Sequence, residues 1–251
     1  MTIGVALALV LAACGGAEAT ESTASDPTGE VLVSAAASLT DAFTDIEAAF
    51  EAEHPEVDVI LNLGGSSSLR EQILEGAPVD VFASANASNM GRIAEAGLIS
   101  GPPQVFASNL LRIAVPVGNP AGITGLEDFG RTELLIGLCA AAVPCGAFAR
   151  QALDNAGVIA AIDTNEPDVR ALLPNVEAGE LDAGITYVTD VASTDGAVEG
   201  VDIPADVNVA AEYPIATLAA APNAGGGAAF VAFVLSEEGR TILASHGFGT
   251  R

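Results

Sequence analysis

The sequence predicts an α/β fold made of two lobes, each a mainly parallel β-sheet flanked by helices, with a two-strand hinge between them. Three observations predict this architecture. Short apolar runs alternate with helical patterns along residues 31–250, which is typical of parallel sheets covered on both faces. Half of the 251 residues are hydrophobic, enough to build a globular core. Two such sets of elements are joined by two extended runs, which indicates two lobes.

The chain opens with a short apolar run over residues 3–11, followed by Leu-Ala-Ala-Cys-Gly at residues 11–15. The run is far shorter than the roughly 20 residues that span a bilayer, so we expect a secretory signal over residues 1–13. The five-residue motif resembles the lipobox of bacterial lipoproteins, and this resemblance implies that Cys14 becomes the lipid-bearing N-terminus. Residues 14–30 contain no hydrophobic residue large enough to build a core and are expected to form a flexible tether.

The first set of elements belongs to lobe 1, which we expect to comprise residues 31–112 and 214–251. Ser38 and Ser68 each begin an S-x-x-D or S-x-x-E pattern, typical of a capped helix N-terminus. One apolar stripe at helical spacing consists of Leu39, Phe43, Ile46 and Phe50. In order, the set contains a strand over residues 31–37, a helix stopped by His54-Pro55, a strand over 57–63, a small-residue turn over 64–68, a helix from Leu69 and a strand over 79–83.

The second set belongs to lobe 2, expected over residues 113–213. Extended runs at 110–117 and 212–218 lead into and out of it, and an amphipathic helix over 225–246 closes the chain in lobe 1. Within lobe 2 the pattern predicts a strand over 134–138, a helix over 146–155, a helix over 168–178 that Pro174 should kink or shorten, and a strand over 184–188.

The charge of the chain excludes several function classes. There are 33 acidic and eight basic residues, all eight of them arginines, and the net charge is −25. The lack of lysine rules out a P-loop lysine and a Schiff-base or pyridoxal-phosphate site. A nucleic acid is disfavoured as a partner, because its binding depends on cations that neutralise phosphates.

Serine hydroxyls lie at both early strand-to-helix junctions, beside expected helix N-termini. A helix N-terminus presents free N–H groups and a partial positive charge, so it can bind a small anion without Lys or Arg. Plain N-capping by serine explains the same residues and stays open as the alternative at this point.

Six ordered blocks resemble the periplasmic molybdate-binding protein family over residues 31–250. They read AAASLT at 35–40, GSSSL at 65–69, APVDVFASAN at 77–86, VPCG at 143–146, DVR at 168–170 and AGITY at 183–187. Asn86 stands where the family often has Asp. The resemblance implies a type-II periplasmic binding fold that holds a tetrahedral oxyanion between its lobes.

The resemblance also implies the residues that bind the oxyanion. Ser38 and Ser66 would donate from their hydroxyl and backbone N–H groups, Cys145 and Val169 from backbone N–H groups, and Tyr187 from its phenol. Arg170, beside one of these positions, is expected to position the lobes or a docking partner. No cofactor and no directly ligated metal cation is expected.

Two cysteines flank the loop that enters the second lobe's site. In an exported protein the C-x5-C spacing of Cys139 and Cys145 is consistent with a disulfide, which would fix the N–H of Cys145. Two free buried thiols are the alternative.

These observations predict a monomeric, lipid-anchored, extracytoplasmic protein that delivers molybdate or tungstate to an ABC transporter permease. The membrane would be contacted through the lipid only. One alternative is a receptor for sulfate or another oxyanion. A second is an exported serine hydrolase using Ser38 or Ser66, which needs a nearby histidine, whereas His54 and His246 are expected to be caps or surface residues. A ligand-sensing domain of a regulator is disfavoured by the exported N-terminus and by the lack of a basic segment.

Overall fold

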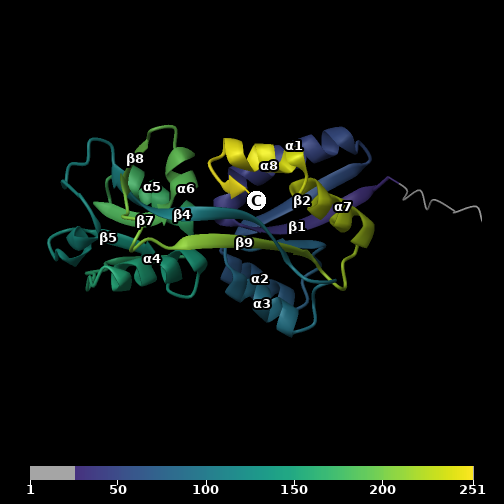
Figure 1. Ribbon diagram of the computed structural model, residues 1–251, viewed down its shortest axis with the longest axis horizontal. Helices are drawn as coiled ribbons and strands as arrows, with labels where there is room; N and C mark the ends of the chain where they lie inside the picture. The colour runs from purple at the N-terminus through teal and green to yellow at the C-terminus, as the bar shows by residue number, and fades with distance from the viewer. Residues whose placement is uncertain (1–25, 251) are drawn as a thin grey trace, which may run out of the picture.

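The computed structural model describes residues 26–250, and the expected signal, Cys14 and most of the tether lie outside them. Figure 1 shows two lobes side by side, with two long strands running between them. Lobe 1 contains β1 (Gly29–Ala36), a 3₁₀ turn (Ala37–Leu39), α1 (Thr40–Glu53), β2 (Val57–Gly64), α2 (Ser66–Leu74), β3 (Val81–Ala83), α3 (Ala87–Glu95), α7 (Ala224–Val234), α8 (Glu237–Ser245) and β10 (Gly249–Thr250).

Lobe 2 holds the second set, and two strands connect it to lobe 1. Its elements are a 3₁₀ turn (Leu126–Gly130), β5 (Ile136–Cys139), α4 (Pro144–Asn155), β6 (Thr164–Glu166), α5 (Val169–Glu177), β7 (Ala183–Tyr187), α6 (Val188–Ala192) and β8 (Val198–Asp202). The connecting strands are β4 (Gln104–Pro116) and β9 (Ala210–Thr217). Among the described residues no helix is long and apolar enough to cross a membrane.

The sheet order explains how the two lobes share the connecting strands. The order is β2-β1-β3-β9-β4-β7-β5-β6. β1 is parallel to β2 and β3, and β5 is parallel to β6 and β7. β4 runs antiparallel to β9 through residues 104–110 and antiparallel to β7 and β8 through residues 111–116. The α/β alternation therefore gives parallel strands inside each lobe, and the antiparallel pairs arise where the chain crosses between lobes.

The apolar stripe of α1 forms part of the lobe 1 core as predicted. Leu39, Phe43, Ile46 and Phe50 are fully buried. The rings of Phe43 and Phe50 lie 6.0 and 5.4 Å from that of Phe230, so the stripe packs α1 against α7. α1 ends at Glu53, directly before His54-Pro55.

Several predicted boundaries are wrong, and the contacts of the folded chain explain the differences. β1 begins at Gly29, inside the expected tether, because Gly29 and Glu30 already pair with β2. α2 begins at Ser66 rather than at Leu69, so Ser68 lies inside the helix and does not cap it. Ser38 does not cap α1 either, and its hydroxyl is bonded to Tyr213 instead. α4 begins at Pro144, two residues earlier than expected.

The single helix expected over residues 225–246 is two helices in the structure. The first helix, α7, ends at Val234. Ser236 caps the second, α8, because its Oγ accepts from Gly239 N at 3.1 Å. A Cβ atom on Gly239 would lie 2.3 Å from Phe233 O, so the close turn between α7 and α8 requires glycine. The sequence analysis also missed five short elements, namely α3, α6, β6, β8 and β10.

Candidate functional site

A small cavity lies between the lobes, with a volume of about 20 Å³. This is far below the several hundred Å³ of an organic-ligand pocket, so the closed site has no room for an organic ligand. All five residues predicted to bind an oxyanion line it. The complete lining is Ala36, Ala37, Ser38, Gly65, Ser66 and Ala85 from lobe 1, and Val143, Pro144, Cys145, Asp168, Val169 and Tyr187 from lobe 2.

Three helices begin at the cavity wall and direct their N-termini towards it. Ser66 and Val169 are the first residues of α2 and α5, whose N–H groups have no acceptor within their own helix. In α4, Pro144 occupies the first position and has no N–H, so Cys145 supplies the first one. Three such N-termini concentrate partial positive charge on one point without any cationic side chain.

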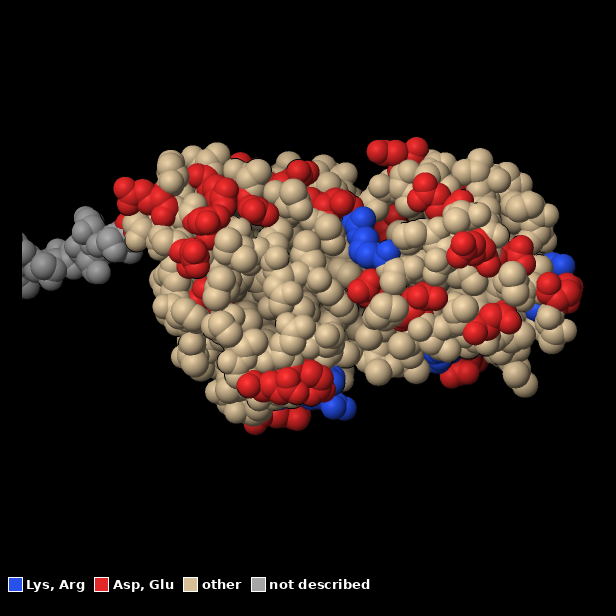
Figure 2. Space-filling view, turned by 180° about the vertical axis from the view of Figure 1, so that it is seen from behind, with Lys and Arg blue, Asp and Glu red and all other residues tan. Residues whose placement is uncertain are grey.

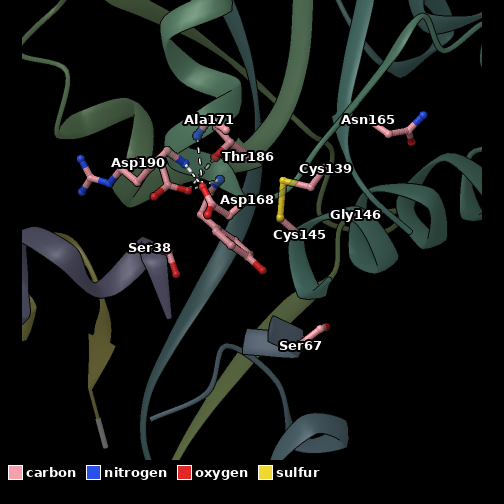
Figure 3. Close-up of a disulfide and its surroundings, with 12 residues drawn as sticks. Ser38, Ser67, Cys139, Cys145, Gly146, Asn165, Asp168, Ala171, Thr186 and Asp190 are labelled. Atoms are coloured by element: carbon pink, nitrogen blue, oxygen red, sulfur yellow. Dashed lines mark hydrogen bonds between the residues drawn. A yellow bond between two sulfur atoms is a disulfide. The ribbon is translucent and has the colours of Figure 1, made fainter. Parts of the chain in front are cut away.

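The cap of α5 leaves one backbone donor for a ligand. Asp168 Oδ1 accepts from Arg170 N at 2.9 Å and from Ala171 N at 3.1 Å, as Figure 3 shows. These bonds use the second and third N–H groups of the helix. The first N–H, on Val169, is not engaged by the cap.

The hydroxyls of Ser38, Ser66 and Tyr187 are the remaining candidate donors. Those of Ser66 and Ser38 are each hydrogen bonded to another group of the protein. Ser66 Oγ accepts from Ala85 N at 3.0 Å, so its own proton remains available. Ser38 Oγ lies 2.9 Å from the phenol oxygen of Tyr213. Figure 3 shows Ser38 on the lobe 1 side, and Asp168 and the Cys139–Cys145 disulfide on the lobe 2 side.

The third hydroxyl, on Tyr187, forms no hydrogen bond of good geometry within the described residues, although the nearby phenol of Tyr213 influences its pKa. The residue is 1% exposed, and its phenol oxygen has no hydrogen-bond partner among the described residues. A buried polar atom without a partner costs about 1–3 kcal/mol, so native proteins rarely keep one without a ligand or water to satisfy it. Burial also raises the pKa of Tyr187 well above its usual value, which keeps the phenol protonated as a donor.

A buried carboxylate lies directly behind Tyr187. Asp190 Oδ2 accepts from Thr186 Oγ1 at 2.6 Å and from Tyr187 N at 3.1 Å. Burial raises the pKa of Asp190 to about 6, although these bonds and the charge of Arg170 oppose the rise. Asp190 therefore fixes the backbone of Tyr187 and does not line the cavity itself.

The structure contains the disulfide between Cys139 and Cys145, with a Cα–Cα distance of 5.8 Å. It joins the end of β5 to the first turn of α4 (Figure 3). A Cβ atom on Gly146 would lie 2.1 Å from Ala140 O, so the loop packs directly on the helix N-terminus. Arg150 also donates to Cys139 O at 2.8 Å. The N–H of Cys145 is thus held by covalent and polar contacts.

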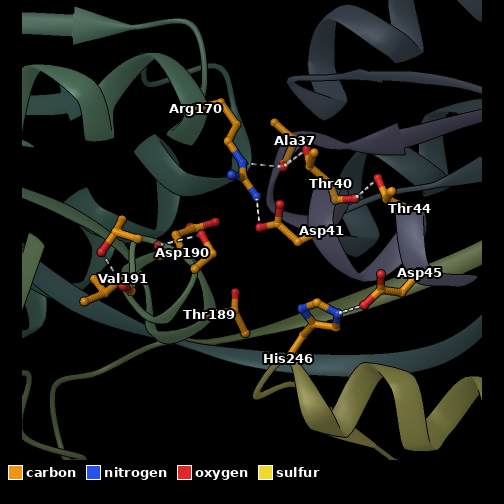
Figure 4. Close-up of polar contacts among 12 residues, drawn as sticks. Ala37, Thr40, Asp41, Thr44, Asp45, Arg170, Thr189, Asp190, Val191 and His246 are labelled. Atoms are coloured by element: carbon orange, nitrogen blue, oxygen red, sulfur yellow. Dashed lines mark hydrogen bonds and ion pairs between the residues drawn. The ribbon is translucent and has the colours of Figure 1, made fainter. Parts of the chain in front are cut away.

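Contacts across the cavity rim join the two lobes. Figure 4 shows Arg170 of lobe 2 reaching Asp41 in an ion pair and Ala37 O at 3.4 Å, both in lobe 1. Ser67 Oγ of lobe 1 donates to Ala142 O of lobe 2. A Cβ atom on Gly65 would lie 3.0 Å from Pro167 O, so the backbones of the lobes approach closely there. The structure therefore represents a closed arrangement of the lobes.

The geometry gives no hydrolase triad. His246 Nε2 lies 2.7 Å from Asp45 Oδ2 (Figure 4), and His54 packs on the ring of Phe50. Within residues 26–250 neither histidine is hydrogen bonded to Ser38 or Ser66, and no group of His, Cys, Asp and Glu could hold a metal ion. A wider outer cleft of about 490 Å³ is lined by His246 and Arg170 together with Ser38.

The molecular surface is acidic over most of its visible face (Figure 2). Figure 2 shows acidic side chains distributed over both lobes of the visible face, with few basic ones. A dianion must therefore be attracted by short-range donors, because the net charge of −25 opposes it at long range and salt screens that repulsion beyond about 8 Å.

Sequence reasoning missed the contact between Tyr213 and Ser38. Tyr213 lies in the expected extended run and is 175 positions away from Ser38, so no local pattern connects the two. Only the sheet order, which places β9 beside β3 and β4, brings them together.

Comparisons with known proteins agree with this architecture. A family model described as bacterial extracellular solute-binding protein matches residues 31–249. The molybdate-binding protein ModA of Mycobacterium bovis is 38% identical over 244 residues, covering 95% of this chain and 92% of its own. In fold, the chain is similar to the sulfate-binding protein SubI of Mycobacterium tuberculosis (TM-score 0.78, 18% identity, 88% and 87% coverage). It is also similar to a periplasmic molybdate-binding protein of Azotobacter vinelandii (TM-score 0.74, 15% identity, 88% and 99% coverage). The predicted type-II periplasmic binding fold is confirmed.

Proposed function

From the premise that the chain belongs to the family of bacterial extracellular solute-binding proteins, we propose that it is a receptor for molybdate or tungstate. It captures the oxyanion between its lobes outside the cytoplasm and delivers it to the permease of an ABC importer. Binding and lobe closure are its whole activity, and no catalytic step or cofactor takes part.

One observation supports this proposal most strongly. The donors expected from Ser38, Ser66, Cys145, Val169 and Tyr187 come from both lobes and line one small cavity. The buried phenol of Tyr187 lacks a partner there among the described residues, which is the state expected of a donor reserved for a ligand. The relative that is 38% identical is a molybdate-binding protein.

The donor set has enough binding energy for a dianion. Hydrogen bonds to a charged group contribute about 1.5–3 kcal/mol each. Three hydroxyls and four N–H groups, less the cost of closing the lobes, leave about 8–12 kcal/mol, which corresponds to micromolar to nanomolar affinity. Selection against sulfate would rest on cavity size, because Mo–O and W–O bonds are longer than S–O bonds.

Isothermal titration of the purified protein with molybdate, tungstate and sulfate tests the proposal. We expect saturable 1:1 binding of molybdate and tungstate, weaker binding of sulfate, and about 10- to 100-fold weaker molybdate binding by Ser38→Ala. Thr241→Ala is the matched control, because it removes an exposed hydroxyl on α8. Equal or tighter binding of sulfate would instead assign the protein to sulfate, and no binding of any oxyanion would refute the proposal.

The anchoring of the protein is part of the same proposal. We infer that Cys14 becomes the lipidated N-terminus and that a monomer is tethered to the outer face of the cell envelope. Mass spectrometry of native protein extracted from membranes should show a lipidated Cys14, and Cys14→Ser should move the protein to the soluble fraction. An unprocessed Met1 would contradict this assignment.

A further inference from the structure

We propose that Tyr213 is a positioning residue of the site: it donates to Ser38 and so turns the serine proton towards the bound oxyanion. The inference rests on the proposed function, since it concerns the same cavity. Tyr213 itself does not line the cavity, and its hydrogen bond reaches the cavity through Ser38.

The contact between the two hydroxyls is direct and buried. Ser38 Oγ and the phenol oxygen of Tyr213 are 2.9 Å apart. Tyr213 is 0% exposed and Ser38 is 7% exposed, so water does not compete for this bond. Ser38 lies on the 3₁₀ turn after β1, whereas Tyr213 lies on the connecting strand β9.

The phenol has a fixed position because its ring is packed on several sides. The rings of Phe106, Tyr187 and Phe248 lie 6.3, 6.2 and 5.5 Å from that of Tyr213, each with an edge-on geometry. Such packing restrains the ring more than a single hydrogen bond could. The hydroxyl of Ser38 can rotate freely in principle, so the rigid phenol sets the orientation of the serine.

The direction of the bond follows from the charge of the ligand. An oxyanion only accepts hydrogen bonds, so Ser38 must point its proton towards it. One lone pair of Ser38 Oγ then faces Tyr213, which must donate. Burial raises the pKa of Tyr213 above its usual value, so the phenol keeps the proton that it donates. In a chain of this kind each bond polarises and strengthens the next.

Ser66 shows the same arrangement independently. Its Oγ accepts from the backbone N–H of Ala85 at 3.0 Å, which likewise leaves the serine proton to face the cavity. The two serines of lobe 1 are therefore oriented by protein donors behind them, one from the backbone and one from a side chain. This parallel identifies the Tyr213 phenol as part of the binding machinery as well as of the core.

A double-mutant cycle separates positioning from packing. Molybdate affinity is measured by isothermal titration for wild type, Tyr213→Phe, Ser38→Ala and the double variant, with Thr241→Ala as the control for loss of a hydroxyl. Tyr213→Phe keeps the packed ring and should weaken binding about three- to tenfold. In the Ser38→Ala background the same change should have almost no effect, because the group through which Tyr213 acts is missing.

The outcomes distinguish this inference from the proposed function. If wild type binds no oxyanion, the proposed function fails. If wild type binds molybdate but Tyr213→Phe binds equally well, or loses the same factor with and without Ser38, the positioning role is refuted.

A second measurement does not depend on the folding of Tyr213→Phe. The sequence has only two tyrosines, so fluorotyrosine incorporated into a Tyr187→Phe variant labels residue 213 alone. Fluorination makes the phenol a stronger donor and should tighten molybdate binding when Ser38 is present. An unchanged affinity would overturn the inference, as would the same gain in a Tyr187→Phe/Ser38→Ala protein.

Discussion

The unpartnered phenol of Tyr187 predicts that one substitution will have opposite effects on stability and on binding. In Tyr187→Phe the ring and its packing remain, and only the buried hydroxyl is removed. Without ligand that hydroxyl has no hydrogen-bond partner among the described residues. Its burial therefore destabilises the ligand-free folded state, and removing the hydroxyl should stabilise that state. With molybdate bound, the same removal deletes a hydrogen bond to a dianion.

The two magnitudes follow from the burial of the group. An unsatisfied buried polar group costs about 1–3 kcal/mol, so the ligand-free variant should gain about 1 kcal/mol of unfolding free energy. For a protein of this size that raises Tm by about 2–4 °C. A hydrogen bond to a charged group contributes about 1.5–3 kcal/mol, so molybdate should bind about 10- to 150-fold more weakly.

Thermal unfolding without ligand and isothermal titration with molybdate measure the two effects. Tyr213→Phe is a matched comparison, because it is the same chemical change at the other buried tyrosine, whose hydroxyl bonds to Ser38. We expect Tyr213→Phe to lower Tm by about 2–4 °C, since it breaks a bond worth about 1 kcal/mol. If Tyr187→Phe lowers Tm as Tyr213→Phe does, or binds molybdate as tightly as wild type, the phenol of Tyr187 is not reserved for a ligand.

Three further predictions follow from other contacts. The pKa of Asp190 is raised to about 6, so its protonation stabilises the folded state below pH 4, and this stability is lost as pH rises through 6. The unfolding free energy of Asp190→Asn, measured by chemical denaturation, should therefore rise by about 3 kcal/mol relative to wild type between pH 4 and pH 7. A difference between the two proteins that stays constant with pH would contradict this. Replacing both Cys139 and Cys145 by Ala opens a short loop, which should lower the unfolding free energy by about 2 kcal/mol and weaken molybdate binding. A reductant should weaken molybdate binding by wild type in the same way. An affinity that does not change with reductant would contradict the role of the disulfide. Arg170→Gln breaks the partly exposed ion pair with Asp41 that joins the two lobes. In stopped-flow experiments this variant should release molybdate about two to five times faster than wild type, and the difference should shrink at high salt. Equal release rates would show that the ion pair does not hold the lobes together.

The sequence predicted the elements whose pattern is local. The apolar stripe from Leu39 to Phe50 predicted the helix that packs into the core of lobe 1. The alternation of strands and helices predicted the parallel strands inside both lobes. The five site residues were implied by the resemblance of ordered sequence blocks to a known family, and the structure places all of them around one cavity. Their roles as ligands remain a prediction until the titrations are made.

The errors arose where distant contacts override local preference. Ser38 matches a helix cap, but its hydroxyl is bonded to Tyr213 from another strand. Ser236 interrupts a run that reads as one helix, because a turn with Gly239 against the α7 backbone is available only in the folded chain. The short strands β6 and β8 have no alternating pattern of their own and exist because β5 and β4 offer free edges.

The close approach of the lobes at Gly65 offers a way to block their closure. Because even a methyl group there would press on Pro167 O, a branched side chain at this position would act as a steric wedge between the lobes. Such a molecule would keep every donor group and still be unable to assemble them around one ion. It would supply an open-state reference for the transport cycle, in which the effect of shape can be studied apart from that of chemistry.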